Sequence, residues 1–410
     1  MITKLDHVTL IDGIHDTPLA DAWVLVEADR IVRIGQYPEE PGPADQTVDL
    51  RGCTLLPGLF NLHVHIQRRH LAARQQQVFR VGAAAVENAP DTYRVVWAIK
   101  NAWRELFSGV TTLRDCASKN RINNTLRDMI RAGIVKGPDV LSCGFGIAAT
   151  GGHETHRYQG AVEVDGPDEV RKAVRMEIKQ GADFIKFMAS GGIGGMPEHE
   201  DPSWVEMGLD ELRSGIEEAH DRNKRTTVHA MGERSILRAL EAGVDCIEHG
   251  VNLNEEALAM MKERRVFYVP TLSGITAVAE REQRSGSREL GDLIQRRVVE
   301  PLKQSIQLAA EQDITIGCGT DTFGDVITEM QLFHACGLSN MTCIKTATAN
   351  AARICGLEAN CGTVEPGKLA DLVIVGKNPL EDLEHLRLVR KVMKRGMLVD
   401  LDWAVQLQSV

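Results

Sequence analysis

The sequence predicts an α/β protein: a (β/α)8 TIM barrel with a small β-sandwich domain built from both chain termini. Two patterns support this. The middle of the chain alternates short apolar segments with charged segments of helical period, over about eight units, which is typical of parallel strands joined by helices. The two ends contain only short apolar segments separated by turns, and neither end can bury a core alone.

The terminal strands come first in this scheme. They are expected in HVTLIDG, AWVLVEADRIVRIGQ and TVDLRGCTLLPG at the start, and in GTVEPGKLADLVIVGKNP and VRKVMKRGMLVD at the end. Because these segments would pair into one domain, we expect the sandwich to comprise residues 1–57 plus 358–410. The barrel would then occupy residues 58–357.

The barrel strands follow in chain order. They are expected in LFNLHVHI, GVTTLRDC, VLSCGFGI, DFIKFMAS, RTTVHAM, CIEHG, RVFYVPTL and ITIGCGTD. Helical segments follow most of them, such as DELRSGIEEAHDRN, ERSILRALEAG, NEEALAMMKERR and a long run from about residue 280 to 312. A doubly wound open sheet is the alternative, but no GxGxxG follows the first strand, which weakens it.

Composition narrows the class of protein. A net charge of −10 argues against nucleic-acid binding. No apolar run approaches the ~18 residues of a membrane span, and the first residues lack the apolar segment of a secretory signal. The nine cysteines contain no CxxC pair, which favours reduced thiols in the cytoplasm. We therefore expect a cytoplasmic protein without membrane or nucleic-acid partners. A small-molecule partner and a homo-oligomeric state are further expectations, which composition does not decide.

The stretch PGLFNLHVHI carries the first chemical signal. His63 and His65 stand two residues apart in a strand, so their side chains point to the same face. Two imidazoles that converge in this way can begin a zinc-type site, although two satisfied histidines at a strand end give the same pattern.

Further metal-competent residues stand at other strand ends. In a barrel these ends meet at one mouth, where the chemistry occurs. A single histidine or aspartate at a strand end is more often a cap, but a set drawn from five strands is hard to explain in that way. The set is His63, His65, Lys186, His229, His249 and Asp321.

Lys186 is the unusual member of this set. It lies in FIKFM, where burial of a bare ammonium would be costly. One interpretation is an ion pair with a neighbouring acid. The other is that CO2 adds to the neutral amine, giving a carbamate whose two oxygens each bind a metal.

These motifs resemble the amidohydrolase superfamily. The words LLPGLFNLHVH, IKFMASGG, IEHG, GTD, ATANAARICGL and GTVEPGKLADLVIV are similar to its imidazolonepropionase-like and Xaa-Pro/Xaa-Arg dipeptidase-like branch. The resemblance implies two divalent metal ions, usually zinc, and N6-carboxylysine at Lys186 as the bridge. It implies that His63, His65 and Asp321 hold the more buried metal. The more exposed metal would be held by His229 and His249.

The resemblance also implies a reaction. A hydroxide that bridges the two metals would attack an amide carbonyl polarised by the exposed metal. Asp321 would move the proton to the leaving nitrogen. In the loop ATGGHETHRYQG, His153 would donate to the oxyanion, since related dipeptidases have a similar TGGH. His153 as a loop-packing residue is the alternative.

Substrate recognition departs from the resemblance. Relatives typically have HAY after the fifth strand, where a tyrosine helps to hold a substrate carboxylate, but here the text is HAMGERS with Met231 in that place. Arg234, or Arg157 with Tyr158, could bind a carboxylate instead. Equally, Met231 could face an apolar leaving group.

Four functions are therefore open at this point. We expect hydrolysis of N-acyl amino acids or dipeptides, with neutral aryl amides, ureas or carbamates as the alternative substrates. A deaminase of the same superfamily would typically bind one metal and lack the bridging lysine. A metal-free structural protein on this fold would be expected to have lost ligands, and none is missing.

Overall fold

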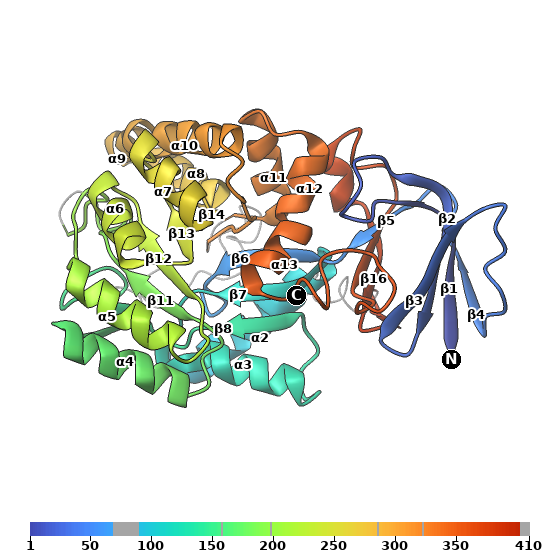
Figure 1. Ribbon diagram of the computed structural model, residues 1–410, viewed down its shortest axis with the longest axis horizontal. Coiled ribbons are helices and arrows are strands. Elements are labelled where there is room, and N and C mark those ends of the chain that lie inside the picture. The colour runs from blue at the N-terminus through green and yellow to red at the C-terminus, as the bar shows by residue number, and fades with distance from the viewer. Residues whose placement is uncertain (69–89, 157–158, 197–198, 285–286, 322–323, 402–410) are drawn as a thin grey trace.

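The computed structural model describes the chain except for residues 69–89, 157–158, 197–198, 285–286, 322–323 and 402–410. Within the described residues, the strands form three sheets, of eight, six and three strands. Every strand pair in the two smaller sheets is parallel. The expected α/β class with parallel strands is therefore confirmed, and Figure 1 shows the parallel part on the left and the terminal part on the right.

Both chain ends build the eight-stranded sheet, as expected. Its order is β17-β16-β15-β5-β1-β2-β3, and β4 pairs with β1. A buried apolar cluster from both ends of the chain, which includes Val24 and Leu372, packs against this sheet. Because the hydrogen bonds join all eight strands into one sheet, the expected sandwich of two sheets stays a prediction. The strands are β1 (Ile2–Leu10), β2 (Leu19–Glu27), β3 (Arg30–Gln36), β4 (Gln46–Asp49), β5 (Thr54–Pro57), β15 (Leu372–Val375), β16 (Val389–Lys394) and β17 (Met397–Leu398).

The parallel strands carry the predicted site. The smaller sheet contains β6 (Leu59–Val64), β7 (Val110–Asp115) and β8 (Asp139–Ser142). The larger has the order β10-β9-β11-β12-β13-β14. Its strands are β9 (Gly146–Ala148), β10 (Ala161–Glu163), β11 (Ile185–Met188), β12 (Thr226–Ala230), β13 (Cys246–His249) and β14 (Phe267–Val269).

The expected eighth strand, ITIGCGTD, forms only an isolated parallel bridge between Tyr268 and Ile316. Its backbone nevertheless reaches both parallel sheets: Gly317 N donates to Tyr268 O at 2.8 Å, and Leu62 N donates to Cys318 O at 2.8 Å. The glycines explain the irregularity, because glycine weakens a strand where another backbone approaches closely. A Cβ on Gly319 would lie 3.0 Å from the backbone nitrogen of His63.

Helices pack around the parallel strands, and Figure 1 shows α3, α4 and α5 side by side along one edge. The long helical run expected from about residue 280 is divided among the end of α8, α9, the π turn η2 and α10. The helices are α2 (Asp91–Phe107), α3 (Ile122–Arg131), α4 (Pro167–Lys179), α5 (Leu209–His220), α6 (Glu233–Ala242), α7 (Glu255–Arg264), α8 (Leu272–Arg284), α9 (Arg288–Ile294), η2 (Gln295–Val299), α10 (Glu300–Glu311), α11 (Val326–Ala335), α12 (Asn340–Thr346) and α13 (Ala349–Cys355).

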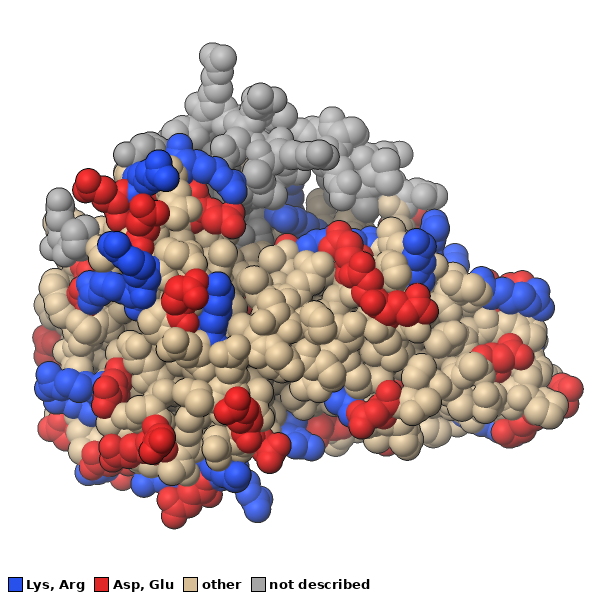
Figure 2. All heavy atoms as spheres, turned by 90° about the horizontal axis from the view of Figure 1, so that it is seen from above, with Lys and Arg blue, Asp and Glu red and all other residues tan. Residues whose placement is uncertain are grey.

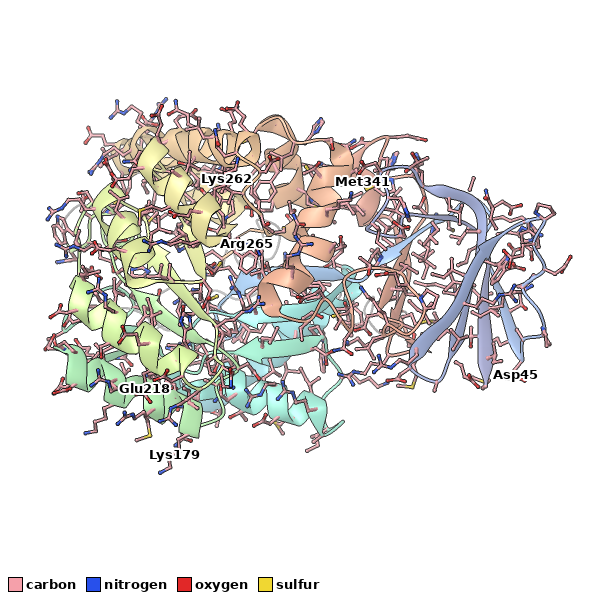
Figure 3. The ribbon with its side chains drawn as sticks, viewed as in Figure 1. Asp45, Lys179, Glu218, Lys262, Arg265 and Met341 are labelled. Carbon is pink, nitrogen blue, oxygen red and sulfur yellow. The ribbon has the colours of Figure 1, made fainter. Side chains whose placement is uncertain are left out.

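The outer surface is that of a charged, hydrated protein. Lys179 on α4 and Lys262 on α7 project from the outer layer of helices (Figure 3). Basic and acidic side chains are interspersed on the face shown in Figure 2. Searching the described helices reveals none that combines the length and the apolar character needed to cross a bilayer.

A charged cluster joins the terminal sheet to the parallel strands. Lys394 Nζ on β16 donates to Asp139 on β8 at 2.7 Å and to Asp371, just before β15, at 2.7 Å. Arg395 donates to Asp139 at 3.1 Å. Burial would raise the pKa of Asp139, but Lys394 and Arg395 outweigh it and hold that pKa below its usual value.

Asp139→Asn should therefore lower the free energy of unfolding at pH 7 by about 2 kcal/mol, since a charge-assisted hydrogen bond is lost. A carboxyl whose pKa is lowered in the folded state stabilises above its usual pKa and loses that effect as the pH falls. The difference from wild type should thus shrink as urea titrations move from pH 7 to about pH 3. Asp168→Asn, at an exposed pair on α4, is the control and should behave like wild type. A difference for Asp139→Asn that stays constant with pH would contradict this account.

Candidate metal centre

The six side chains predicted to bind metal line one cavity at the carboxyl ends of the parallel strands. The backbone register offsets His229 and His249 by one residue, since His229 on β12 pairs with Glu248 and Ala230 pairs with His249 on β13. The set that lines the cavity includes His63, His65, Lys186, His229, His249 and Asp321.

The four histidine rings lie close together. The ring centroids of His63 and His65 are 5.4 Å apart, and those of His63 and His249 are 5.0 Å apart. His229 and His249 are separated by 4.5 Å. Asp321 Oδ1 lies 3.6 Å from His65 Nε2. The ligand atoms of His63, His65 and Asp321 lie within 4.8 Å of one another, so these three residues could hold one ion.

Hydrogen bonds fix the tautomers of the two histidines from the first parallel strand. His63 Nδ1–H donates to Glu248 Oε2 at 2.7 Å. His65 Nδ1–H donates to the carbonyl of Ala117 at 3.0 Å. In the neutral ring the other nitrogen then carries the lone pair. Both Nε2 atoms are therefore available as metal ligands.

The other two histidines are oriented from different elements. His229 Nε2–H donates to the carbonyl of Gly191 at 3.2 Å, which leaves the lone pair on Nδ1. His249 Nδ1 lies 2.7 Å from the hydroxyl of Thr271, which can donate or accept. Each ring is thus held in place by one nitrogen, as is usual for histidines that bind metals.

Burial lowers the pKa of all four imidazoles, because water no longer solvates the charged ring. The neighbouring cationic groups lower it further, with Lys186 acting on three of the rings. The rings are therefore neutral at neutral pH, which is the state that binds a metal. The four are His63, His65, His229 and His249.

Lys186 points into the same cavity. Its neighbour Phe187 faces the helices, since a Cβ on Gly215 of α5 would lie 2.6 Å from the Phe187 ring. Side chains alternate along a strand, so Lys186 faces the opposite way. It is only 1% exposed. Its Nζ has no hydrogen-bond partner among the residues that the structure describes. The ion pair considered from the sequence is not formed with any of them.

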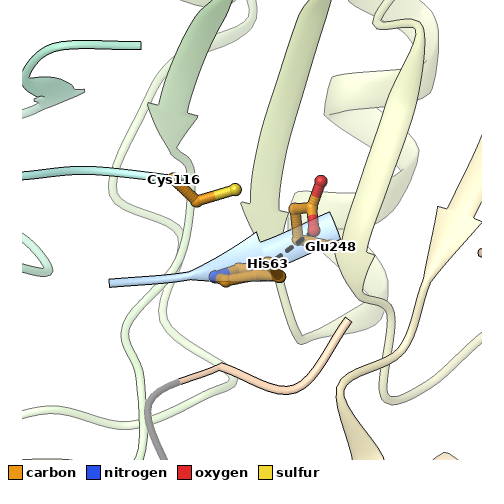
Figure 4. Close-up of side chains that lie close together, drawn as sticks. All are labelled: His63, Cys116 and Glu248. Carbon is orange, nitrogen blue, oxygen red and sulfur yellow. Dashed lines mark hydrogen bonds and ion pairs between the residues drawn. The ribbon is translucent and has the colours of Figure 1, made fainter. Parts of the chain in front are cut away.

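A second cluster lies beneath His63, and Figure 4 shows its members, His63, Cys116 and Glu248. Glu248 is completely buried and also accepts hydrogen bonds from Arg114 and Thr227. Burial would raise the pKa of Glu248, but Arg114, Lys186 and His63 together outweigh burial and keep the carboxylate ionised. Burial also raises the pKa of Cys116, which keeps the thiol protonated and therefore a weak ligand. This cluster orients His63 and is not suited to hold an ion itself.

Two more buried carboxylates hold the groups that orient the histidines. Asp115 accepts from the backbone N–H of Ala117 at 3.3 Å, and the carbonyl of Ala117 orients the second histidine of the HxH pair. Glu329 accepts from the backbone N–H of Ser273 at 2.5 Å. Ser273 lies two residues after Thr271 in the chain, and the hydroxyl of Thr271 contacts His249.

Left-handed backbone conformations occur at the same site. His249, Thr271 and Asp321 have φ angles of 69°, 60° and 54°. Residues other than glycine adopt such angles at a cost, and the surrounding structure must hold them there. Three such residues at one site indicate that the fold tolerates backbone strain there in order to position these side chains.

His153 lies beside the metal-competent histidines. Its ring stacks on His229 with centroids 4.1 Å apart. Its backbone N–H donates to Glu206 at 2.8 Å, and its Nδ1 lies 3.3 Å from Glu200. Burial acts to lower the pKa of His153, but the hydrogen bond and charge of Glu200, together with the charges of Glu154 and Glu206, outweigh burial and raise that pKa.

The rest of the cavity is largely apolar. It encloses about 690 Å³ of empty space, part of it open to solvent. Among its apolar lining residues are Met188, Ile193, Met231, Ile275 and Val278. The charged residues that line it, besides the metal-competent set, are Arg68, Glu154 and Arg281.

Met231 and Arg234, two of the residues predicted to bind substrate, differ in their position relative to the cavity. Met231 is buried and lines the cavity, as expected of a contact to substrate. Arg234 is exposed on α6 and does not line the cavity within the described residues. Arg234 is the second residue of α6 (Glu233–Ala242). Arg157 and Tyr158 lie outside the described residues.

Several residues of the site escape prediction from the sequence. Glu248 stands next to His249 in IEHG, and a charged residue inside a buried strand is a usable signal. Arg114, in TTLRD, gives the same signal. Arg281 and Glu200 carry no such signal, because only the folded chain brings them to the cavity or to His153.

Comparisons with known proteins agree with this geometry. A model of the Amidohydrolase family matches residues 54–399. The chain is 29% identical over 412 residues to ochratoxinase from Aspergillus niger, covering 93% of this chain and 83% of that protein. It is 25% identical to imidazolonepropionase from Symbiobacterium thermophilum, covering 90% and 88%. A crystal structure of a Xaa-Pro dipeptidase with bound methionine is 29% identical, with a TM-score of 0.87 over 98% of this chain and 100% of that one.

Fold and site together define a metal-dependent hydrolase that acts on carbon–nitrogen bonds. The chain belongs to the Amidohydrolase family.

The two clusters that include His63 can be told apart by mutation. Cys116→Ala should leave the metal content of the purified protein unchanged, because the thiol is not a ligand. Glu248→Gln should weaken metal binding about 10- to 100-fold, since the partner of a ligating histidine is lost. It should also lower the free energy of unfolding of the chelator-treated protein by about 3–5 kcal/mol, because Arg114 is left buried without its anion. Metal analysis and urea unfolding measure both effects.

Loss of metal in Cys116→Ala would show that the Cys116 cluster holds an ion. The double variant Arg114→Met with Glu248→Gln should cost less stability than the two single changes added together, because it removes both charges of one pair. Additive costs would contradict the pairing.

Proposed function

We propose that this protein hydrolyses an amide bond with two divalent metal ions, zinc by family resemblance. His63, His65 and Asp321 would hold the more buried ion. The more exposed ion would be held by His229 and His249. Lys186, as N6-carboxylysine, would bridge the two ions.

One observation carries the proposal. The amine of Lys186 is buried at a strand end, faces the cavity and has no hydrogen-bond partner among the described residues. A bare ammonium there would cost several kcal/mol of desolvation without compensation. The ammonium first loses one proton. The neutral amine then adds to CO2, which forms an N–C bond, breaks one C–O π bond and releases a second proton, so a cation is replaced by an anion. Such an anion suits a site whose other ligands are neutral imidazoles and one carboxylate.

The donor set fits a binuclear site. Each of the three histidines with a fixed tautomer presents a lone pair, and the fourth ring is held by a hydroxyl. Nitrogen and oxygen donors of this kind suit zinc. Glu248, the fully buried acid beside the rings, is occupied by Arg114 and His63 and cannot serve as the bridge.

When bound, the two metals would lower the pKa of a water between them and polarise the scissile carbonyl. Asp321 would accept the proton of the attacking water and pass it to the leaving nitrogen. His153 would donate from Nε2 to the oxygen that gains charge, while Glu200 holds its Nδ1–H. The apolar wall of the cavity would exclude other water from the reacting atoms.

For the substrate we propose N-acyl amino acids or dipeptides. The relatives named ochratoxinase and Xaa-Pro dipeptidase support an amide substrate. Neutral aryl amides, ureas or carbamates are the second candidate. They are favoured by the apolar lining and by Met231 where relatives have a tyrosine.

The finer points of architecture are part of the proposal. We propose that the two parallel sheets are arcs of one closed (β/α)8 barrel spanning residues 58–357, since residues 317 and 318 bond to β14 and β6. Residues 1–57 plus 358–410 would form a β-sandwich domain. We further propose a homo-oligomer in the cytoplasm, a setting that the nine free thiols support.

Lys186→Ala should reduce bound metal from about two to about one or fewer equivalents per chain and abolish turnover, because the bridge is lost. Adding a short carboxylic acid should restore part of both, by occupying the place of the carbamate. Lys186→Arg should not be restored, because a guanidinium stays cationic. Metal analysis and hydrolysis of N-acyl amino acids measure these outcomes.

The matched control is Lys179→Ala, at an exposed position on α4, which should keep full metal and turnover. Full metal and turnover in Lys186→Ala would overturn the bridging role. A wild-type protein that holds one metal and releases ammonia from its substrate would point to a deaminase instead.

A further inference from the structure

Helix α8 forms one wall of the cavity. Gly274, Ile275, Val278 and Arg281 of this helix all line it. Their spacing places them along one face of the helix. The wall therefore begins at a glycine, continues through two branched apolar side chains and ends in a guanidinium.

The start of this wall is fixed against the metal ligands. A Cβ on Gly274 would lie 2.3 Å from the carbonyl of Thr320 and 3.0 Å from Cβ of Asp321, so only glycine permits this approach. Glu329 accepts from Leu272 N at 2.8 Å, which secures the first turn of the helix. The geometry of the wall is thus set relative to Asp321.

Arg281 stands at the far end of the wall. Seven residues of helix separate it from Gly274, which is about 10 Å along the axis. Arg281 nevertheless lines the same cavity as Asp321.

The pairing of Arg281 holds its guanidinium in place. Its Nε and NH2 donate to Glu282 Oε1 at 2.9 and 2.6 Å. Within the described residues, Glu282 does not line the cavity, so this carboxylate holds the guanidinium from outside. The side chain of Arg281 is 31% exposed, which leaves it accessible to a ligand.

Arg68, the other arginine that lines the cavity within the described residues, is buried, unlike Arg281. It forms an ion pair with Glu154, which is also buried and lines the cavity. The two charges of that pair compensate each other inside the cavity. Both arginines are therefore paired, but Glu154 lines the cavity beside Arg68, whereas Glu282 does not line it within the described residues.

We propose that Arg281 binds the carboxylate of the substrate and thereby selects N-acyl amino acids and dipeptides with apolar leaving residues over neutral amides. This inference rests on the proposed amide hydrolysis. Ile275 and Val278 contact the apolar side chain of the leaving residue. The planar guanidinium of Arg281 suits a carboxylate because it can donate two parallel hydrogen bonds.

The test uses substrate pairs that differ only in charge: N-acetyl-leucine and N-acetyl-phenylalanine, each beside its C-terminal carboxamide. Metal-loaded wild type should prefer each acid to its amide. Arg281→Met should lower kcat/KM for the acids about 10- to 100-fold, mainly through KM, because a charge-assisted contact is lost. The amides should change by less than about threefold, so the acid preference disappears. Arg281→Lys should retain part of the preference.

Arg284→Met is the matched control, since Arg284 lies on the same helix in an exposed pair with Glu280 and should behave like wild type. Equal losses on acids and amides in Arg281→Met, or no loss on the acids, would overturn the role of Arg281. So would a wild type without acid preference. If Arg281→Met does not fold, kcat/KM on the acids and on the amides is compared for Arg281→Gln and Arg281→Lys instead, and the same outcomes overturn or support the role of Arg281. A metal-loaded wild type that cleaves neither member of any pair would instead overturn the proposed function.

Discussion

The buried amine of Lys186 is the constraint on which the rest of the site depends. Four imidazoles, which burial keeps neutral, surround a cavity that this amine also faces. A cation in that position would repel metals and would lack solvation. Conversion to a carbamate reverses the sign of the charge and supplies two oxygens. Under the proposed function, the strand that carries Lys186 would hold both metals only in its modified state, and metal binding would be coupled to CO2.

The fold supports this site through a layer of buried carboxylates. Glu248 holds one histidine directly and is itself held by Arg114. Asp115 accepts a hydrogen bond from the backbone of Ala117, the residue that orients His65. Glu329 accepts one from the backbone of Ser273, two residues after the threonine that contacts His249. Burial raises the pKa of Asp115 and of Glu329 to about 7, so these two carboxyl groups are not fully ionised at neutral pH. All three acids contribute a fixed orientation of the histidines. Thr271, which orients His249, directly precedes α8, the helix that forms one wall of the cavity. The histidine and this wall are therefore held by one continuous segment.

Much of this arrangement could be predicted from local sequence. The HxH spacing requires a strand to place both rings on one face, and the alternation of strands and helices requires the strand ends to meet. What could not be predicted depends on contacts between distant segments. The glycines of ITIGCGTD reduce the eighth strand to a bridge, because His63 approaches them closely. Arg234 looked suitable beside Met231 but faces solvent, whereas Arg281 reaches the cavity only through the packing of α8.

The most direct test of the central claim is the chemical state of Lys186 in the metal-loaded protein. The protein would be prepared with zinc and 13C-labelled bicarbonate and examined by carbon NMR, beside Lys186→Ala prepared in the same way. A crystal structure of the metal-loaded wild type would locate the labelled group. The account predicts a carbamate signal in wild type only, and density for a carboxylated side chain at Lys186 between two metals. An unmodified ammonium at Lys186 in an enzyme with two metals and full turnover would contradict it.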